Sequence, residues 1–278
     1  MGTLFVVSTP IGNLDDLTRR AESTLHRVSR VLAEDTRRTR ILMNHIGAVT
    51  RVVSLHAHNE AARIPRVLEW LAAGEDLALV SDAGTPLLSD PGQRVVRASI
   101  DAGHEVVPIP GASAVLAALV ASGLPAGAFA FLGFPARKGK DRARALARVG
   151  NAGESTILYE APGRLSALLE DLVEVCGDAR RVAVGREITK LHEEFFRGTL
   201  AAAVLHFRDR KVRGEVTLVV EPTCEQQDEE DASEGIELAR TLLAAGQRPS
   251  EVARELSSRL GLPRNLAYSL VHDRGAEE

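Results

Sequence analysis

The sequence predicts an α/β fold, with two α/β domains in tandem and a small helical unit after them. Short apolar runs recur along the first two thirds of the chain, and their length is that of buried strands rather than helices. Each run ends in a turn rich in Gly, Pro, Ser or Asp, and most turns lead into a helical pattern. This alternation is typical of a sheet covered by helices on both faces.

Composition limits the class of protein. The chain has 278 residues, 45% of them hydrophobic and 26% charged, with a net charge of −4 and a pI near 6.1. These values are ordinary for a globular protein, and nucleic-acid binding would need a local basic patch. Cys176 and Cys224 have no CxxC spacing, which indicates a reducing compartment. We expect no signal peptide and no membrane helix, and therefore a cytoplasmic protein.

The first domain is expected over residues 1–122. Its strands are expected at Leu4–Ser8, Val31–Ala33, Val52–Leu55, Leu77–Val80 and Glu105–Ile109. The helix after the first strand places Leu14, Leu17, Ala21 and Leu25 on one face. A second helix opens near Thr36, a third covers His58–Ala73 with Gly74 as an αL cap, and an apolar helix covers Ala112–Ala121.

The second domain is expected over residues 123–224, after a Gly- and Pro-containing linker at 122–127. Its strands are expected at Phe129–Phe134, Thr156–Tyr159, Val182–Gly185, Glu194–Arg197 and Val216–Val220. Residues 225–234 hold six acids and no Lys or Arg, which favours a solvated linker. Residues 235–278 are expected to form three helices, with Ser250 as an N-cap and Gly261 and Pro263 separating the last two.

Polar residues follow the run Leu77–Val80 abruptly. In open α/β sheets, ligands bind beyond the carboxyl ends of the strands. Asp82 would accept hydrogen bonds there, and Gly84 would let the backbone approach a ligand that carries ribose hydroxyls and amines. Taken alone, these residues fit an ordinary strand-to-helix turn better. The GxGxxG and GxSxG motifs are absent, and no segment has the spacing of a phosphate-binding loop. The sequence therefore gives no motif support for a dinucleotide-binding protein, a hydrolase or an NTPase.

Three blocks of residues, taken together, resemble one family. They are Ser8–Thr18; Val80–Pro86 with Ser89–Gly92 and Pro108–Ser113; and Gly185–Glu194. In this order they resemble the ribosomal RNA small-subunit methyltransferase I family of the tetrapyrrole-methylase superfamily, from residue 3 to about 222. Tetrapyrrole-modifying members carry a Gly-Pro-Gly loop after the first strand. This chain has Thr-Pro-Ile-Gly-Asn instead, which favours the RNA branch.

The resemblance implies that S-adenosylmethionine is held in a cleft between the two α/β domains. It also implies 2′-O-methylation of a cytidine ribose in small-subunit ribosomal RNA, free or in a 30S-type subunit, by a homodimer without a metal. Carried over residue by residue, it assigns the cofactor to Pro10, Asp82, Gly84, Thr85, Ala112 and Ser113, with Tyr159 and Val219 from the second domain.

The candidate catalytic residues lie in the third block. A ribose 2′-hydroxyl is a poor nucleophile, so methyl transfer needs in-line positioning and a base or cation that makes the alkoxide less unfavourable. Lys190 is the candidate for this role, beside Arg186 and Glu187. The assignment depends mostly on the family motif, because composition alone fits an exposed charged loop equally well.

Two basic clusters could bind RNA. Arg37, Arg38 and Arg40 open one helix, and Arg137, Lys138 and Lys140 begin a segment, 137–148, with six bases and one acid. Each cluster could neutralise phosphates, although a solvated helix face is the commoner role of such residues. Aromatic residues make up only 4% of the chain, which disfavours an aromatic base-stacking platform.

Two other functions remain open at this stage. The first is a methyltransferase with the same cofactor cleft that acts on a tetrapyrrole or another small substrate. The second is a non-catalytic RNA-binding or assembly protein, which would bind no cofactor. The basic segment and the terminal helical unit argue against the first, since a porphyrinoid needs neither.

Overall fold

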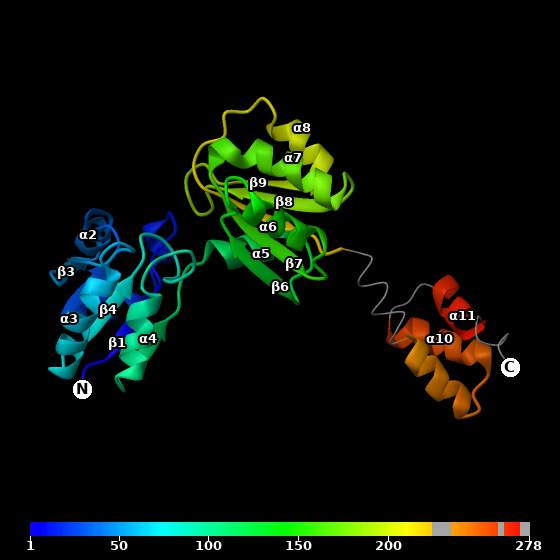
Figure 1. Ribbon diagram of the computed structural model, residues 1–278, viewed down its shortest axis with the longest axis horizontal. Helices are drawn as coiled ribbons and strands as arrows, with labels where there is room; N and C mark the ends of the chain where they lie inside the picture. Colours follow the sequence, from blue (N-terminus) through cyan, green and yellow to red (C-terminus); the bar gives the residue numbers. More distant parts are fainter. Residues whose placement is uncertain (224–234, 261–263, 273–278) are drawn as a thin grey trace. The chain divides into compact units, whose positions relative to one another are not determined.

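The computed structural model describes residues 1–223, 235–260 and 264–272 (Figure 1). The expected linker at 225–234 and the helix break at Gly261 and Pro263 lie outside these residues. The chain divides into two compact units. The larger comprises Met1–Gly150 and Ser155–Glu221, and the smaller comprises Asn151–Glu154 and Pro222–Glu278. The larger unit contains two five-stranded sheets, so the predicted α/β class is confirmed.

The first sheet is entirely parallel, with the strand order β3-β2-β4-β1-β5. Its strands are β1 (Leu4–Val7), β2 (Arg30–Ala33), β3 (Arg51–Ser54), β4 (Leu77–Val80) and β5 (Val106–Ile109). Every residue of β4 is buried, which explains why this strand is a continuous apolar run. Because the strands are parallel, the loops after all five carboxyl ends meet at one edge of the sheet.

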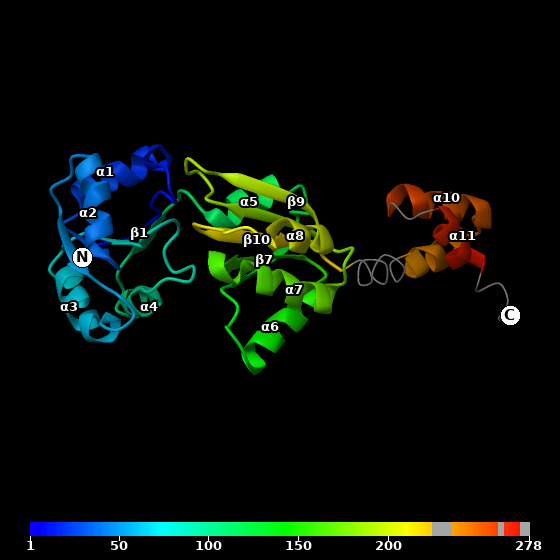
Figure 2. The same cartoon turned by 90° about the horizontal axis from the view of Figure 1, so that it is seen from above.

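Helices cover both faces of this sheet, as Figure 2 shows. The 3₁₀ turn η1 (Leu14–Asp16), α1 (Arg19–Arg27) and α2 (Thr36–His45) lie against one face, and α3 (Glu60–Ala72) and α4 (Gln93–Asp101) against the other. Gly74 follows α3 with φ of 84°, which confirms the expected αL cap. The helix begins two residues later than expected, because His56 to Asn59 form a turn in which the His56 carbonyl accepts the amides of Asn59 and Glu60.

The second sheet is mixed, with the order β6-β7-β10-β8-β9. Its strands are β6 (Phe129–Gly133), β7 (Ser155–Glu160), β8 (Arg181–Arg186), β9 (Glu194–Thr199) and β10 (Val216–Val220). Helix α5 (Ala114–Ser122) covers one face, and α6 (Lys140–Gly150), α7 (Leu165–Cys176) and α8 (Leu200–Phe207) cover the other, with the 3₁₀ turn η2 (Pro162–Arg164) before α7. Along β10, Leu218 and Val219 face opposite cores, as the two-residue period of a strand requires.

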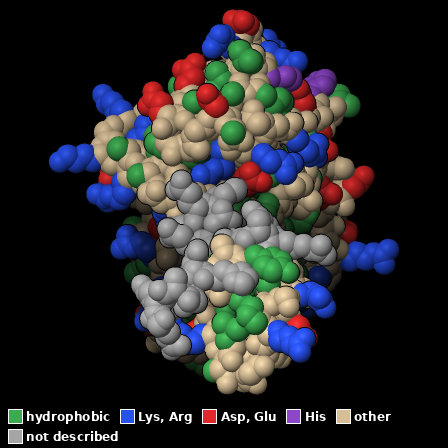
Figure 3. Space-filling model, turned by 90° about the vertical axis from the view of Figure 1, so that its right-hand side faces the viewer, with side chains coloured by type: hydrophobic (Ala, Val, Ile, Leu, Met, Phe, Trp, Pro, Cys, Tyr) green, Lys and Arg blue, Asp and Glu red, His purple; other side chains and the backbone are tan. Residues whose placement is uncertain are grey.

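The smaller unit contains helical residues 235–244, α10 (Pro249–Arg259) and α11 (Arg264–His272). Val252, Leu256 and Ala267 lie in its core. On the face drawn in Figure 3, Lys and Arg side chains project among Asp, Glu and scattered apolar ones. The expectation that Ser250 caps a helix is wrong, because the helix opens earlier with Pro249 at its first position. No helix among the described residues is long and apolar enough to cross a membrane.

Candidate functional site

The loops after the neighbouring strands β1 and β4 are joined by a two-residue bridge. The Thr9 amide donates to the Gly84 carbonyl at 2.9 Å, and the Gly84 amide donates to the Thr9 carbonyl at 3.0 Å. Gly84 has φ of 82°, and a Cβ there would lie 3.0 Å from Cγ2 of Ile11. The bridge therefore needs a glycine for both its backbone angle and its packing. The Ser81 hydroxyl donates to the carbonyls of Ala83 and Gly84, which closes the turn further.

This bridge borders a cavity of about 430 Å³, the first of two adjoining pockets in the larger unit. Five carboxylates line it. Glu34 follows β2, Asp82 and Asp90 lie in the segment between β4 and α4, Glu160 ends β7, and Glu215 precedes β10. The second sheet contributes Phe134 and Tyr159, whose ring centroids lie 5.3 Å apart. The pocket thus combines acids from both sheets with an aromatic pair from the second.

Burial and mutual repulsion act on these acids. Burial and then the charge of Asp82 raise the pKa of Glu34, while burial and then the charge of Glu34 raise the pKa of Asp90 to about 6. Burial also raises the pKa of Tyr159 to about 12, so its hydroxyl stays neutral. The one Lys or Arg among the pocket-lining residues that the structure describes is Arg38, 3.7 Å from Asp82. The cavity therefore suits a ligand that carries positive charge.

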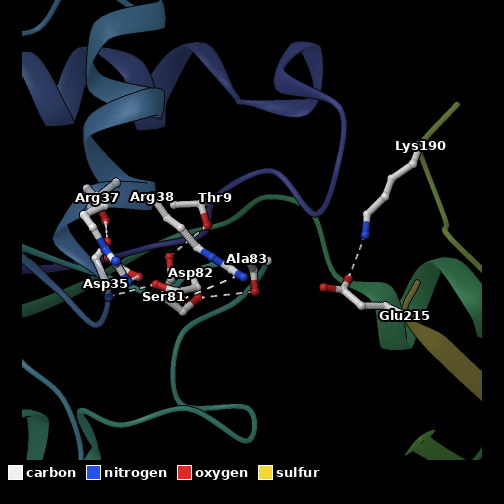
Figure 4. A network of polar contacts seen from close by, with 10 residues as sticks. Thr9, Asp35, Arg37, Arg38, Ser81, Asp82, Ala83, Lys190 and Glu215 are labelled. Atoms are coloured by element: carbon white, nitrogen blue, oxygen red, sulfur yellow. Dashed lines mark hydrogen bonds and ion pairs between the residues drawn. The ribbon is translucent and has the colours of Figure 1, made fainter. Parts of the chain in front are cut away.

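Asp82 is held in place by the start of α2 (Figure 4). Its Oδ1 accepts the backbone amide of Asp35 at 2.9 Å. Asp35 in turn caps α2 by accepting the amide of Arg37 at 2.8 Å, and it also binds the Arg37 guanidinium. These hydrogen bonds to Arg37 lower the pKa of Asp35. The N-terminus of one helix thus fixes the central carboxylate of the first pocket.

The second pocket, of about 320 Å³, contains Lys190. Its ammonium donates to Oε1 of Glu187 at 2.8 Å and to Oε2 of Glu215 at 3.2 Å, the latter drawn in Figure 4. Burial lowers the pKa of Lys190, but the hydrogen bonds and charges of Glu187 and Glu215 outweigh burial, and the pKa lies above its ordinary value. Lys190 is therefore a cation at neutral pH.

The backbone around Lys190 adopts uncommon angles. Glu187 and Thr189 have φ of 53° and 70°, in the left-handed region that residues with a Cβ rarely occupy. Gly214 makes room for the Glu187 carboxylate, since a Cβ there would stand 2.1 Å from its Cδ and Oε1. Such strained segments concentrate at functional sites, where the surrounding structure imposes them.

Comparison with known proteins places this geometry in a family. A model of the tetrapyrrole (corrin/porphyrin) methylases matches residues 3–204. Proteins named ribosomal RNA small subunit methyltransferase I are similar over nearly the whole chain: the Synechocystis protein is 44% identical over 97% of both chains, and the Halalkalibacterium halodurans protein is 41% identical over 98% of this chain and 95% of its own. This chain belongs to the ribosomal RNA small subunit methyltransferase I family of the tetrapyrrole methylases.

A solved structure supports the methylase fold. Uroporphyrin-III C-methyltransferase from Thermus thermophilus, complexed with S-adenyl homocysteine, is 20% identical and has a TM-score of 0.56 over 79% of this chain and 97% of its own. The two-sheet architecture is therefore that of tetrapyrrole methylases, as the sequence motifs predicted.

The structure brings most of the residues assigned to the cofactor around the first pocket. Asp82, Gly84, Thr85, Ser113 and Tyr159 line it. Pro10 lines the second pocket instead, and the Ala112 carbonyl accepts the Thr85 hydroxyl at 3.3 Å without lining either. Val219 is 1% exposed inside the core of the second sheet, so the last strand reaches the pocket through Val216 and Thr217 instead.

The three residues predicted to be catalytic occupy different positions. Lys190 lines the second pocket. Glu187 accepts a hydrogen bond from the Lys190 ammonium but lines neither pocket. Arg186 lies outside both pockets, because its guanidinium donates to Glu194 at 3.0 and 3.1 Å and to the Arg213 carbonyl at 3.3 Å. Arg186 therefore joins β8 to β9 and to the segment before β10.

The residues predicted to bind RNA are all exposed. Arg38 lines both pockets, whereas Arg37 is engaged by Asp35 and Arg40 lies on the outer side of α2. Arg137, Lys138 and Lys140 stand free of both pockets at the start of α6. Arg142 does not belong to this basic surface, since it donates to Asp171 of α7 and to the Ala136 carbonyl. Its pairing with a distant residue could not be seen from spacing within the segment.

Four pocket acids, Glu34, Asp90, Glu160 and Glu215, were not assigned from the sequence. Glu34 follows β2 as Asp82 follows β4, so the same reasoning about the carboxyl edge of the sheet could have found it. Asp90 lies farther along the segment between β4 and α4, and Glu160 ends β7 of the other sheet. Glu215 lies before β10 and lines both pockets. Nothing local marks Glu215, because β10 is antiparallel and its amino end points to the site.

Proposed function

We propose that this chain transfers a methyl group from S-adenosylmethionine to the 2′-oxygen of a cytidine ribose in small-subunit ribosomal RNA. The observation that carries the proposal is the pair of adjoining pockets. They share Ile11, Arg38, Asp82, Ala83 and Glu215, so an acidic cavity and a cavity with a fixed lysine ammonium have a common wall. This arrangement fits a donor and an acceptor that meet across that wall.

The first pocket fits the cofactor by the chemistry of its lining. S-adenosylmethionine supplies an electrophilic methyl group on a sulfonium cation. The carboxylates of Glu34, Asp82 and Asp90 would attract its positive charges and accept from its ribose hydroxyls. Gly84 keeps the loop backbone close to the cavity, and Tyr159 offers an aromatic wall with a neutral hydroxyl. Mutual repulsion among the acids is relieved when a cation binds.

In the proposed reaction the O–CH3 bond would form as the S–CH3 bond breaks, with S-adenosylhomocysteine as the leaving group and the 2′-hydroxyl proton released to water. Lys190 would stabilise the negative charge that develops on the 2′-oxygen. Because the pKa of Lys190 is raised, its side chain is protonated at neutral pH. It would therefore act as a cation and hydrogen-bond donor and not as the base. A fixed ammonium lowers the free energy of a developing alkoxide, and little reorganisation is needed because Glu187 and Glu215 already hold it. Glu187 and Glu215 are thus positioning residues.

The exposed basic residues would contact the RNA backbone. Arg38 lies at the common wall, and Arg137, Lys138 and Lys140 form a separate basic surface. Contacts of this kind orient a nucleic acid and carry no sequence information by themselves. The relatives are named as ribosomal RNA small subunit methyltransferases, and these names support ribosomal RNA over a tetrapyrrole as the substrate. The substrate in turn places the enzyme in the cytoplasm, where ribosomes assemble.

A labelled-methyl assay tests the proposal. Transfer from methyl-labelled S-adenosylmethionine into small-subunit RNA or 30S subunits is expected, with no transfer to a uroporphyrinoid. Transfer to the tetrapyrrole alone would identify a small-molecule methylase. Failure of the cofactor to bind in calorimetry would identify a non-catalytic RNA-binding or assembly protein.

A homodimer forms part of the same proposal. Leu116 and Val120 are 51% and 78% exposed one turn apart on α5, so a partner subunit could cover an apolar stripe there. Sedimentation of the wild type as a dimer, and of Val120→Glu as a monomer, would support it. A monomeric wild type would refute it.

A further inference from the structure

The second pocket is lined by a charged set and an apolar set of side chains. Lys190, Glu215, Arg38 and Asp82 are its charged residues. The apolar set comes from the loop after β1, from η1 and from α2, and it comprises Pro10, Ile11, Leu14, Ile41 and Leu42. A site for phosphate alone would have no use for this apolar set, whereas a nucleoside has both an apolar base face and a polar sugar.

Ile41 is the unusual member of the apolar set. It is 64% exposed on a helix in which Arg37, Arg38 and Arg40 precede it, while the next residue, Leu42, is 7% exposed in the core. Core packing therefore explains Leu42 and leaves Ile41 unexplained. An aliphatic side chain at the rim of a polar pocket can cover the face of an unstacked base, which proteins that bind extruded nucleotides do with aromatic or apolar residues.

The charged residues of the second pocket differ in how firmly they are held. The Lys190 ammonium is held by Glu187 and Glu215, and its stem lies across Gly12. Arg38 is held less firmly, since its side chain is 62% exposed and its guanidinium lies 3.7 Å from the Asp82 carboxylate. A rigid cation inside the pocket and an exposed one at its edge match a sugar oxygen and a backbone phosphate respectively.

We infer that the second pocket receives the acceptor nucleoside, extruded from the RNA, with its base against Ile41 and its ribose toward Lys190. This inference rests on the proposed function, because it names where that reaction takes its substrate. Because Asp82 and Ala83 line both pockets, the acceptor and the cofactor would lie next to each other at these residues. Specificity for one nucleotide would come from this recess, and the basic surfaces would add affinity for RNA of any sequence.

The test compares Ile41→Ser with Val49→Ser. Val49 is 100% exposed in the same sheet region and lines neither pocket, so its replacement removes an equally exposed apolar side chain elsewhere. Loss of an aromatic stacking partner is worth roughly a 5- to 150-fold change, and an aliphatic contact lies toward the low end of that range, at about tenfold. We expect Ile41→Ser to raise the KM for RNA about tenfold, with an unchanged affinity for S-adenosylmethionine, and Val49→Ser to match the wild type.

A fluorescent probe gives a second readout. With 2-aminopurine beside the methylated position, wild-type protein should raise the fluorescence as the neighbour unstacks, and Ile41→Ser should reduce that rise. Equal KM values and equal fluorescence for both variants would overturn the inference while leaving methyl transfer intact. Weaker cofactor binding by Ile41→Ser would overturn it too, since the pocket would then belong to the cofactor. A wild type without RNA methylation would instead remove the proposed function itself.

Discussion

The side chain of Lys190 lies directly across Gly12, so that a Cβ on Gly12 would stand 2.3 Å from Cγ of Lys190. The Cδ and Cε atoms of the lysine would be 3.1 and 3.0 Å from the same point. Gly12 belongs to the loop after β1, whereas Lys190 follows β8, so the two α/β sheets jointly determine where the ammonium lies.

Gly12→Ala should therefore displace Lys190 without disturbing the cofactor pocket. Displacement of a catalytic group by about 1 Å costs on the order of 100-fold in rate. We expect kcat to fall about 10- to 100-fold, with the dissociation constant of S-adenosylmethionine unchanged. Gly127→Ala is the control, because a Cβ there meets nothing within 4 Å. In a double-mutant cycle, Gly12→Ala should add little to Lys190→Ala; independent, multiplicative losses would contradict this coupling.

Lys190→Ala should reduce the single-turnover rate about 100- to 1,000-fold, the usual effect of losing one donor to a developing oxyanion. Because the pKa of Lys190 lies above its ordinary value, the cation is present at all lower pH and is lost only as the pH rises through that raised pKa. The rate of the wild type should therefore show no decrease at low pH that depends on Lys190. An acid limb abolished by Lys190→Ala would show that the neutral amine acts as a base.

Asp90→Asn should weaken cofactor binding and stabilise the protein at neutral pH. The pKa of Asp90 is about 6 in the folded protein and 3.8 ordinarily, so the folded state holds this proton more tightly. Its contribution to the free energy of unfolding therefore falls as the pH rises from 3.8 to about 6. The variant lacks this penalty and should melt higher than the wild type at neutral pH, but not at pH below the ordinary pKa.

The affinity of the wild type for S-adenosylmethionine should fall as the pH drops through 6, because Asp90 then loses its charge beside Glu34, Asp82 and Arg38. Calorimetry over this range checks the step. Asp101→Asn, which removes an exposed acid of α4 outside both pockets, should keep it. If Asp90→Asn also kept the step, Asp90 would not be the group that titrates.

Gly84→Ala should cost stability and cofactor affinity together. A residue with a Cβ at φ of 82° is strained by roughly 1–2 kcal/mol, and here the Cβ also presses on Ile11 at 3.0 Å. Gly47→Ala is the matched control, since its φ is 68° but a Cβ there meets nothing within 4 Å. Thermal unfolding should show both losses, and cofactor titration should show a defect only for Gly84→Ala. Equal cofactor binding by the two variants would separate the bridge from the site.

Charge reversal at Lys138 and Lys140 should weaken RNA binding and flatten its dependence on salt, because fewer counterions are released from the RNA. Arg66→Glu with Arg97→Glu changes the net charge equally, on helices α3 and α4 at exposed pairs of little energetic value. Filter binding at several salt concentrations distinguishes the two. The basic surface would have no role in RNA binding if both double variants gave the same slope.

The sequence was most informative where a pattern is local. The apolar runs of β1 and β4, and the Gly74 cap, follow from residue type and spacing alone. The carboxyl-edge rule led to Asp82 and Gly84, because parallel strands bring their ends together. The domain limits expected from the sequence stay predictions.

Features that depend on distant partners could not be predicted. The pairing of Arg142 with Asp171 joins α6 to α7, and Glu215 reaches the site only because β10 runs antiparallel to its neighbours. The left-handed angle of Glu187 is imposed by tertiary contacts, against its intrinsic preference. Lys190 was recognised through its motif, and only the contacts with Glu187 and Glu215 show that it is a cation.

Nucleoside analysis after a single turnover tests the central claim most directly. Small-subunit RNA is treated with the protein and labelled S-adenosylmethionine, digested to nucleosides and resolved by mass spectrometry. The account predicts that the label appears in 2′-O-methylcytidine and that Lys190→Ala greatly reduces it. Label on a base, as in 5-methylcytidine, or no label on RNA at all, would contradict it.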